Sequence, residues 1–272
     1  MRKAILLVLP TLSFIVVFFL IPLFMVFGQS VHHPPQGWTL STYVAFFQDR
    51  VAREAYFRSL YIALWTTLSA ILIAYPASTA IVGIKNKAMK TFIMTLTVLP
   101  LMTNPVARTF AWLAILGRHG LINKLFIWLG IYKEPVRLLY TEGAVFVGLL
   151  QLFMPLMILS LVSALENIPE DLFLAARSLG ADGLQVFLKV RLPLSIEGLI
   201  IGGTLVFTGS ITAYVTPAIL GGSKVLMLST LLYQKASVVL DWNMATAIAV
   251  IMFLTTLVIN GILRRMGGVK RA

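Results

Sequence analysis

The sequence has 272 residues, of which 59% are hydrophobic and 12% charged, and its formal net charge is +12 at pH 7. A soluble domain is roughly half apolar and a quarter charged, so this composition excludes an ordinary water-soluble globule and indicates a membrane protein. The basic residues stand in short clusters between long apolar runs rather than on one basic face, which argues against nucleic-acid binding.

Six apolar runs reach the length of about 20 residues that a helix needs to cross a bilayer. In chain order they are 4–28, 60–84, 91–116, 144–165, 198–220 and 244–263. Barrel strands would be half as long and would alternate apolar with polar residues. The sequence therefore predicts an all-α, polytopic membrane protein with six transmembrane helices in a single domain, 1–272.

The first run could instead be a secretory signal, because Met1-Arg2-Lys3 supplies a basic start. Its apolar stretch is longer than a signal core of about 7–15 residues, and no small-x-small cleavage site follows. We therefore expect a retained helix. The third run is interrupted by Pro100 and Pro105.

The patch 121–132 is too short to span and contains Lys124, so it predicts an interfacial or re-entrant helix. Trp38, Trp128 and Trp242 fall near the same predicted membrane boundary, as an aromatic belt would.

Basic residues predict the orientation. Two sets of segments alternate along the chain, short ones at 1–3, 85–90 and 264–272 and longer ones at 29–59, 117–143 and 221–243. Nine of the 18 residues in the short set are Lys or Arg, whereas the long set has nine in more than four times that length. Since short cytoplasmic segments are enriched in Lys and Arg, both termini are predicted to be cytoplasmic.

The loop 166–197 is then the one sizeable cytoplasmic loop, and its sequence predicts a short helix. Pro169 followed by Glu170 and Asp171 is typical of a helix start, because proline fits the first turn and acids favour the positive end of the helix dipole. Gly180 is a natural stop for this helix.

Apolar residues in this loop recur at helical i, i+3, i+4, i+7 spacing, at Leu172, Ala175, Ala176 and Leu179. A second short helix, 183–190, is predicted to end before Leu192-Pro193. A small amphipathic face of this kind suits insertion into a groove of a partner protein, although a linker helix lying on the bilayer would show the same stripe.

The spacing of this loop resembles the cytoplasmic signature of ABC importer permeases: Glu-Ala-Ala, three residues, Gly, nine residues, an aliphatic residue, one residue, Leu-Pro. The matching positions are Ala175, Ala176, Gly180, Val190, Leu192 and Pro193. The sequence departs from the signature at Leu174, where the family often has Glu, which weakens one polar contact to an ATPase subunit.

Other stretches resemble the spermidine/putrescine branch of these permeases. They are Arg108-Thr-Phe-Ala-Trp112, Ile115-Leu-Gly117, Gly120-Leu-Ile-Asn123, Pro155, and Thr216-Pro217-Ala-Ile-Leu-Gly-Gly222. The resemblance implies a type I ABC importer permease of a bacterial inner membrane, and a polyamine-like solute.

The resemblance also implies partners. They are a second homologous permease or a second copy, two ATPase subunits, and an external solute-binding protein. ATP and Mg would bind the ATPases, because this chain has no Gly-x-x-x-x-Gly-Lys-Ser/Thr loop; we expect it to bind no cofactor and to have no catalytic residues. The ATPase-coupling residues that the resemblance implies are Glu170, Asp171, Leu174, Ala175, Ala176, Leu179, Gly180, Val190, Leu192 and Pro193.

Candidate residues for the solute pathway are polar, aromatic or at kinks within the predicted spans. They are Asn104, Arg108, Trp112, Gln151, Thr208, Tyr214 and Thr216. Arg108 is the one cation clearly inside a span, where a charge is a functional hypothesis by default; the alternative is that it snorkels or pairs with a helix-end carbonyl. The others could equally be helix-packing residues.

All ten acids lie in loops or at the edges of the predicted spans, which is unexpected for a pathway that carries a polycation. Either the partner permease supplies the carboxylates, or the solute is another small organic compound, such as an amino-acid-like or anionic one, or an ion such as iron. The absence of acids from the interior of the predicted spans also argues against an ion-coupled secondary transporter.

An intramembrane enzyme is disfavoured too. The sequence has no Gly-x-Ser-x-Gly motif and no paired aspartates, and His32, His33 and His119 lie outside the apolar runs. The chain contains no cysteine, which excludes disulfides and Cys-based metal sites, and no metal site is predicted.

Overall fold

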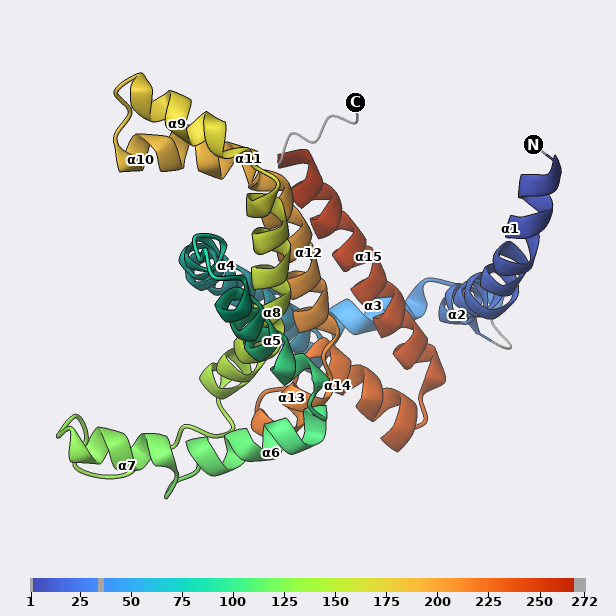
Figure 1. Ribbon diagram of the computed structural model, residues 1–272. Coiled ribbons are helices and arrows are strands. Elements are labelled where there is room, and N and C mark those ends of the chain that lie inside the picture. The colour runs from blue at the N-terminus through green and yellow to red at the C-terminus, as the bar shows by residue number, and fades with distance from the viewer. Residues whose placement is uncertain (1, 34–36, 267–272) are drawn as a thin grey trace.

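The computed structural model describes residues 2–33 and 37–266 as an almost wholly helical protein (Figure 1). Met1 and 267–272, parts of two basic segments used to predict the orientation, lie outside the described residues. Three helices have 25 residues or more: α4 (Arg50–Val82), α8 (Glu142–Glu166) and α15 (Trp242–Met266). They cover the second, fourth and sixth predicted spans.

The centre of the molecule is formed by α4, α8 and α12 (Ile196–Thr212), which all pack against one another. Their contact surface is apolar, with Met157 and Leu161 of α8 and Val206 of α12 fully buried. Glycines let α8 and α12 approach closely, because a Cβ on Gly198 would lie 2.5 Å from the Cβ of Ala164. Small residues at helix crossings are the usual solution where lipid surrounds the bundle.

The first predicted span is built from α1 (Arg2–Ile15), the π-helical turn η1 (Val16–Leu20) and α2 (Ile21–Val31), which we call the N-terminal arm. Its apolar, membrane-length part is Leu9–Val31. In Figure 1 the arm stands apart from the central helices, and α2 packs against α15. Among the arm's described side chains, Ser30 alone is buried.

A short connection follows the arm. The two-residue strands β1 (His32–His33) and β2 (Gly37–Trp38) pair antiparallel, and α3 (Ser41–Gln48) leads into α4. The side chain of Asp49 begins α4 by accepting a hydrogen bond from the Val51 amide at 2.8 Å, as an N-cap should.

The third predicted span, 91–116, is interrupted as predicted, since the structure divides it into α5 (Lys87–Met102) and α6 (Pro105–Leu116); the break lies directly before Pro105, whereas Pro100 lies inside α5. Asn104 caps α6 and Pro105 is its first residue, so the helix restarts there in a new direction. The predicted interfacial helix forms as α7 (Leu121–Trp128), which follows α6 at the end of the bundle opposite α9 (Figure 1).

The fifth predicted span, 198–220, is also broken. After α12 the chain bends at Ala213–Tyr214 into α13 (Val215–Leu220), and α14 (Leu228–Tyr233) with the π-helical turn η3 (Gln234–Val238) leads to α15.

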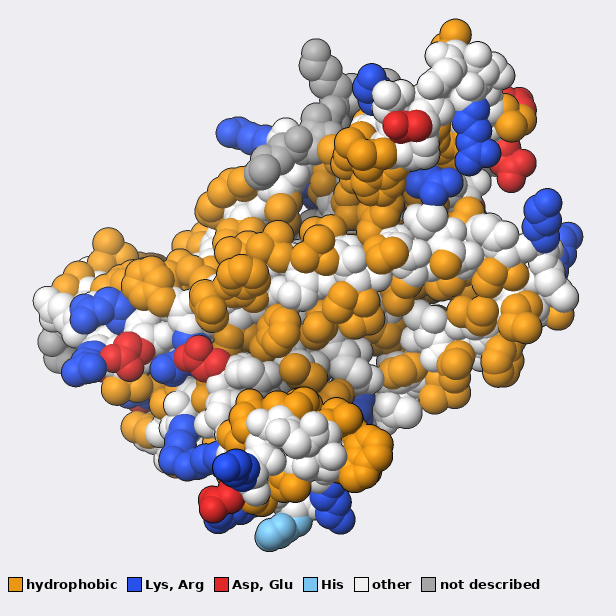
Figure 2. Space-filling model, turned by 90° about the vertical axis from the view of Figure 1, so that its left-hand side faces the viewer, with side chains coloured by type: hydrophobic (Ala, Val, Ile, Leu, Met, Phe, Trp, Pro, Cys, Tyr) orange, Lys and Arg blue, Asp and Glu red, His pale blue; other side chains and the backbone are white. Residues whose placement is uncertain are grey.

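Four described helices are long and apolar enough to cross a membrane, and a fifth crossing results if 183–194 and α12 are taken together. The predicted count of six thus stays a prediction that this architecture accommodates. Figure 2 shows one face of the molecule, where hydrophobic side chains cover the middle and charged side chains gather toward the edges. Such a surface suits a protein surrounded by lipid.

Candidate functional site

Between α8 and α12 the chain protrudes from the bundle as four short elements (Figure 1). They are α9 (Glu170–Ser178), α10 (Gly183–Val186), the π-helical turn η2 (Phe187–Arg191) and α11 (Leu192–Leu194), together called the α9–α11 segment. In Figure 1 this segment lies on the side of the molecule where α1 begins and α15 ends.

The predicted start and stop of α9 are both confirmed. Pro169 is the N-cap, one position before the predicted first turn, and Glu170 and Asp171 occupy that turn, while Arg177 lies in the last turn, so charges of both signs complement the helix dipole. Gly180 follows the helix with a φ of +84°, the left-handed conformation that ends many helices.

The turn at Gly180 satisfies the last carbonyls of α9. The amide of Gly180 donates to the carbonyl of Arg177 at 2.9 Å, and the amide of Ala181 donates to the carbonyl of Ala176 at 3.0 Å. A Cβ on Gly180 would meet no atom within 4 Å, so the glycine is required by the backbone conformation and not by crowding from this chain.

Most of the apolar stripe of α9 is exposed. Leu179 is 89% exposed and Leu172 and Ala175 are also exposed, whereas Ala176 is half-buried. Phe173 is half-buried as well, and its ring stacks on the guanidinium of Arg191 at 5.0 Å. The described part of the chain therefore leaves Leu172, Ala175 and Leu179 of the stripe exposed.

The second half of the signature lies in η2 and α11. The prediction that the second helix ends before Leu192-Pro193 is wrong, since the helix continues to Leu194. Proline is tolerated because it stands in the first turn of α11, directly after the wider π-helical turn. Val190 and Leu192 are half-buried, and Pro193 is exposed.

A cavity of about 280 Å³ lies beneath α9, between the ends of α4 and α8. Charged side chains of both signs line it: Lys90, Glu166, Glu170 and Arg191. Lys90 of α5 forms an ion pair with Glu166, the last residue of α8. Charged groups therefore lie between α9 and the end of the bundle, while Phe187 and Leu192 of the same segment pack against the apolar core.

The pathway candidates do not converge on one site. The structure joins Trp112 of α6 to Gln151 of α8, with the indole nitrogen 3.4 Å from the amide oxygen. Thr208 of α12 instead accepts a hydrogen bond from Asn260 of α15 at 3.1 Å, and Tyr214 stacks with Tyr233 at a ring-centroid distance of 4.5 Å.

Three further candidates have structural partners. The side chain of Asn104 caps α6 by accepting from Val106 at 2.8 Å. Arg108 donates from Nη1 to the carbonyl of Pro100 at 2.8 Å, which is the predicted alternative of pairing with a helix-end carbonyl. Thr216 is buried in α13, where its methyl group lies 2.7 Å from the position of a Cβ on Gly148.

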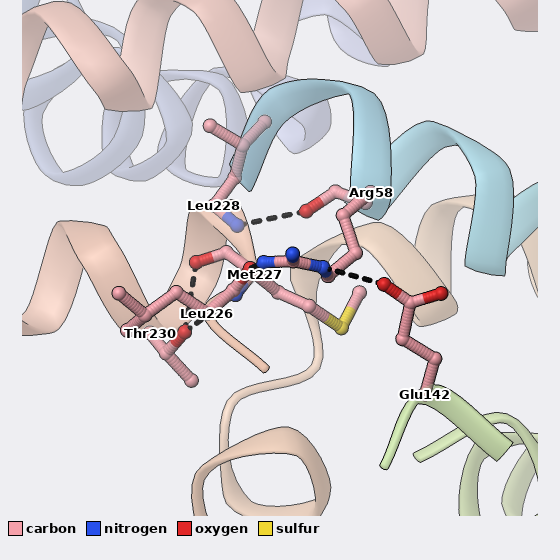
Figure 3. Close-up of polar contacts among 7 residues, drawn as sticks. Arg58, Glu142, Leu226, Met227, Leu228 and Thr230 are labelled. Atoms are coloured by element: carbon pink, nitrogen blue, oxygen red, sulfur yellow. Dashed lines mark hydrogen bonds and ion pairs between the residues drawn. The ribbon is translucent and has the colours of Figure 1, made fainter. Parts of the chain in front are cut away.

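The sequence did not predict a cluster of polar contacts at the end of the bundle opposite α9 (Figure 3). Arg58 of α4 forms an ion pair with Glu142 of α8 at 2.7 Å and also donates to the carbonyl of Leu226 at 3.2 Å. Ser59 accepts from the Leu228 amide at 2.8 Å. These partners are far apart in the sequence, and no local pattern signals that they meet.

Comparison with known proteins gives concordant results. The family described as "Binding-protein-dependent transport system inner membrane component" matches residues 70–267. The chain is 34% identical over 212 residues to the spermidine/putrescine transport system permease protein PotB of Haemophilus influenzae, covering 78% of this chain and 73% of that protein. It is 27% identical over 249 residues to PotB of Escherichia coli, covering 89% and 90%.

The fold also matches a solved structure. A chain of a bacterial ABC transporter involved in the import of the acidic polysaccharide alginate superposes with a TM-score of 0.80 at 17% identity, covering 100% of this chain and 96% of that chain. The same kind of transporter has been solved in complex with an alginate pentasaccharide-bound periplasmic protein.

Proposed function

Because the chain belongs to the family of binding-protein-dependent transport system inner membrane components, we propose that it forms one half of the pore of an ATP-driven importer whose solute is a polyamine. Membership makes the chain a multi-pass permease of the inner membrane and not an enzyme. The polyamine assignment is supported by the two PotB relatives, whose names specify spermidine and putrescine.

The observation that carries the proposal is the largely exposed helix α9. A short rigid helix with an exposed apolar stripe and a tight glycine turn is suited to a groove on another protein. We assign that groove to an ATPase subunit, with Ala175, Ala176 and Gly180 at the centre of the contact. Two such subunits would bind ATP and Mg and carry out the hydrolysis.

In this mechanism the α9–α11 segment is a lever. When the ATPases close on ATP, α9 moves as a rigid body and the central helices rock between inward- and outward-facing arrangements. The charged groups that line the cavity beneath α9 favour such a motion, because they can exchange partners as the helix moves.

The remaining partners follow from the same assignment. A second permease, either a homologue or another copy of this chain, would complete the pore, and a solute-binding protein would dock at the end opposite α9. The periplasmic protein bound to the alginate transporter supports that arrangement. The α9–α11 segment and both ends of the chain would face the cytoplasm, as the basic segments predict.

A second candidate solute is a small anionic compound. The ten acids lie near helix ends or in loops, so a polycation would meet no carboxylate of this chain at mid-membrane depth. Arg108, in contrast, retains a buried Nη2 with no hydrogen-bond partner among the described residues. An anionic oxygen could accept that hydrogen bond.

The test is isolation of the intact complex from bacterial membranes in mild detergent, followed by uptake into proteoliposomes. We expect an ATPase subunit to accompany the chain, and the loaded binding protein to stimulate ATP hydrolysis with spermidine or putrescine. Stimulation by an anionic solute alone would favour the second candidate. If no ATPase subunit accompanies the chain, the importer assignment is wrong.

A further inference from the structure

The joint between the α9–α11 segment and α12 is a single residue. Helix α11 ends at Leu194 and α12 begins at Ile196, and the helices on either side of Ser195 are bent by 64°. Movement of α9 can reach α12 directly through this elbow, and also through α8, which residues 167–169 join to α9 and which packs against α12. What holds Ser195 therefore decides whether the elbow transmits the movement or absorbs it.

Ser195 is held by a residue of another helix. Its side chain is fully buried, and its Oγ lies 2.7 Å from the hydroxyl oxygen of Tyr75 in α4. The Ser195 hydroxyl donates to the carbonyl of Leu192 at 3.2 Å, so its one proton is used there and the Tyr75 hydroxyl is the donor of the shorter bond. Tyr75, Ser195 and the last turn of α11 thus form one chain of hydrogen bonds.

The Tyr75 ring is fixed as firmly as its hydroxyl. Tyr75 is 7% exposed and packs among the buried residues shared by α4, α8 and α12. Its ring meets that of Phe187 in η2 edge-to-face at a centroid distance of 5.3 Å. Since Arg191 of η2 stacks on Phe173 of α9, aromatic contacts connect α9 to α4 through η2.

We propose that the Tyr75–Ser195 pair is a positioning contact that keeps the elbow rigid, so that α12 and α4 turn together when α9 moves. This inference rests on the proposed importer function. Inside a bundle surrounded by lipid, a hydroxyl pair has little water to compete with it, so its loss should loosen the elbow. The bundle itself should still assemble, because its apolar core is unchanged.

The test uses the complete importer complex in proteoliposomes, with radiolabelled spermidine and the variants Tyr75→Phe, Ser195→Ala and both together. The readout is the number of solute molecules imported per ATP hydrolysed. We expect each single substitution to lower this ratio roughly three- to tenfold while ATP hydrolysis continues, the range for one lost hydrogen bond. The double variant should be no worse than the single ones, because they remove the same contact.

A second tyrosine–serine hydrogen bond, away from the elbow, provides a matched control. Tyr43 donates to the buried Ser30 at the same 2.7 Å, but this pair joins α3 to the N-terminal arm, away from the elbow. Tyr43→Phe should leave the transport ratio unchanged. A fall of equal size there would show that the ratio reports general loosening, and would overturn the inference.

Other outcomes are also decisive. Unchanged ratios in both single variants, or effects that multiply in the double variant, would overturn the role of the pair while leaving the importer assignment intact. If the unsubstituted complex imports no spermidine and shows no stimulated hydrolysis, the proposed function fails, and this inference with it. Should one variant not assemble, the other single variant decides.

Discussion

At Gly180 the main chain has a φ of +84°, which costs a residue with a side chain roughly 1–2 kcal/mol. Gly180→Glu should shift the end of α9 and place a charge beside the exposed stripe. We expect ATP hydrolysis by the complex to continue while import falls at least about tenfold, a change of about 1.4 kcal/mol in coupling. The measurement is import and hydrolysis on the same preparation.

Gly130 provides the control for this substitution. It also has a positive φ, +71°, and open space around a Cβ, but it follows α7 at the far end of the molecule. Gly130→Glu should leave coupling unchanged. Normal import by Gly180→Glu would contradict the assignment of α9 as the ATPase contact.

Arg108 permits a second prediction for a single residue. Its bond to the Pro100 carbonyl links α6 to the end of α5, and a hydrogen bond from a charged group contributes about 1.5–3 kcal/mol. Arg108→Met should therefore lower the midpoint of thermal denaturation in detergent without changing the KM for uptake. An unchanged midpoint with a raised KM would instead place Arg108 in the solute pathway.

The sequence predicted the local features of single residues well and their long-range partners poorly. Pro169, the two acids and Gly180 mark the ends of α9 because capping depends on neighbours in the chain. The partner of Tyr75 lies 120 positions away and that of Arg58 lies 84 away, so only the folded bundle reveals them.

Among the helices, the close contact of α8 with α12 depends on glycines that face α8. A Cβ on Gly198 would lie 2.5 Å from the Cβ of Ala164 and 2.9 Å from the carbonyl oxygen of Ser160, a backbone atom that cannot move aside easily. Gly198→Ala should destabilise the protein by roughly 1–3 kcal/mol through overpacking. The midpoint of thermal denaturation in detergent measures this loss of stability.

Gly261 of α15 provides the control for Gly198→Ala, since a Cβ at Gly261 would meet nothing within 4 Å. Gly261→Ala should be neutral or slightly stabilising, because alanine is the better helix former. Equal effects at the two glycines would show that the contact of α8 with α12 is looser than its geometry implies.

Helices were predictable where one apolar run forms one helix, as in α4, α8 and α15. The breaks were harder to place. Two prolines signalled the interruption between α5 and α6, but not that α6 takes a new direction. At Pro193 the local rule failed, because η2 shifts the hydrogen bonding to a wider turn, with the Leu192 amide bound to the Phe187 carbonyl, before proline is reached.

For the whole molecule, the orientation in the membrane can be tested directly because the chain has no cysteine to give a background signal. Leu179→Cys in α9 and Leu121→Cys in α7 place thiols at two strongly exposed positions, at opposite ends of the structure. In cells that produce this chain without the ATPase subunits, so that α9 is uncovered, a membrane-impermeant maleimide should label Leu179→Cys in inverted vesicles only and Leu121→Cys in intact spheroplasts only. The reverse pattern would exclude contact between α9 and a cytoplasmic ATPase.

The N-terminal arm has a consequence for how the protein is made. Its membrane-spanning part is held by α15, through contacts such as the edge-to-face packing of Phe27 on Phe253. The ribosome synthesises α15 only after every other helix of the bundle, so during translation the arm resides in lipid without its final neighbour. Attachment of the arm therefore follows the synthesis of the central helices and is completed only when α15 has been inserted.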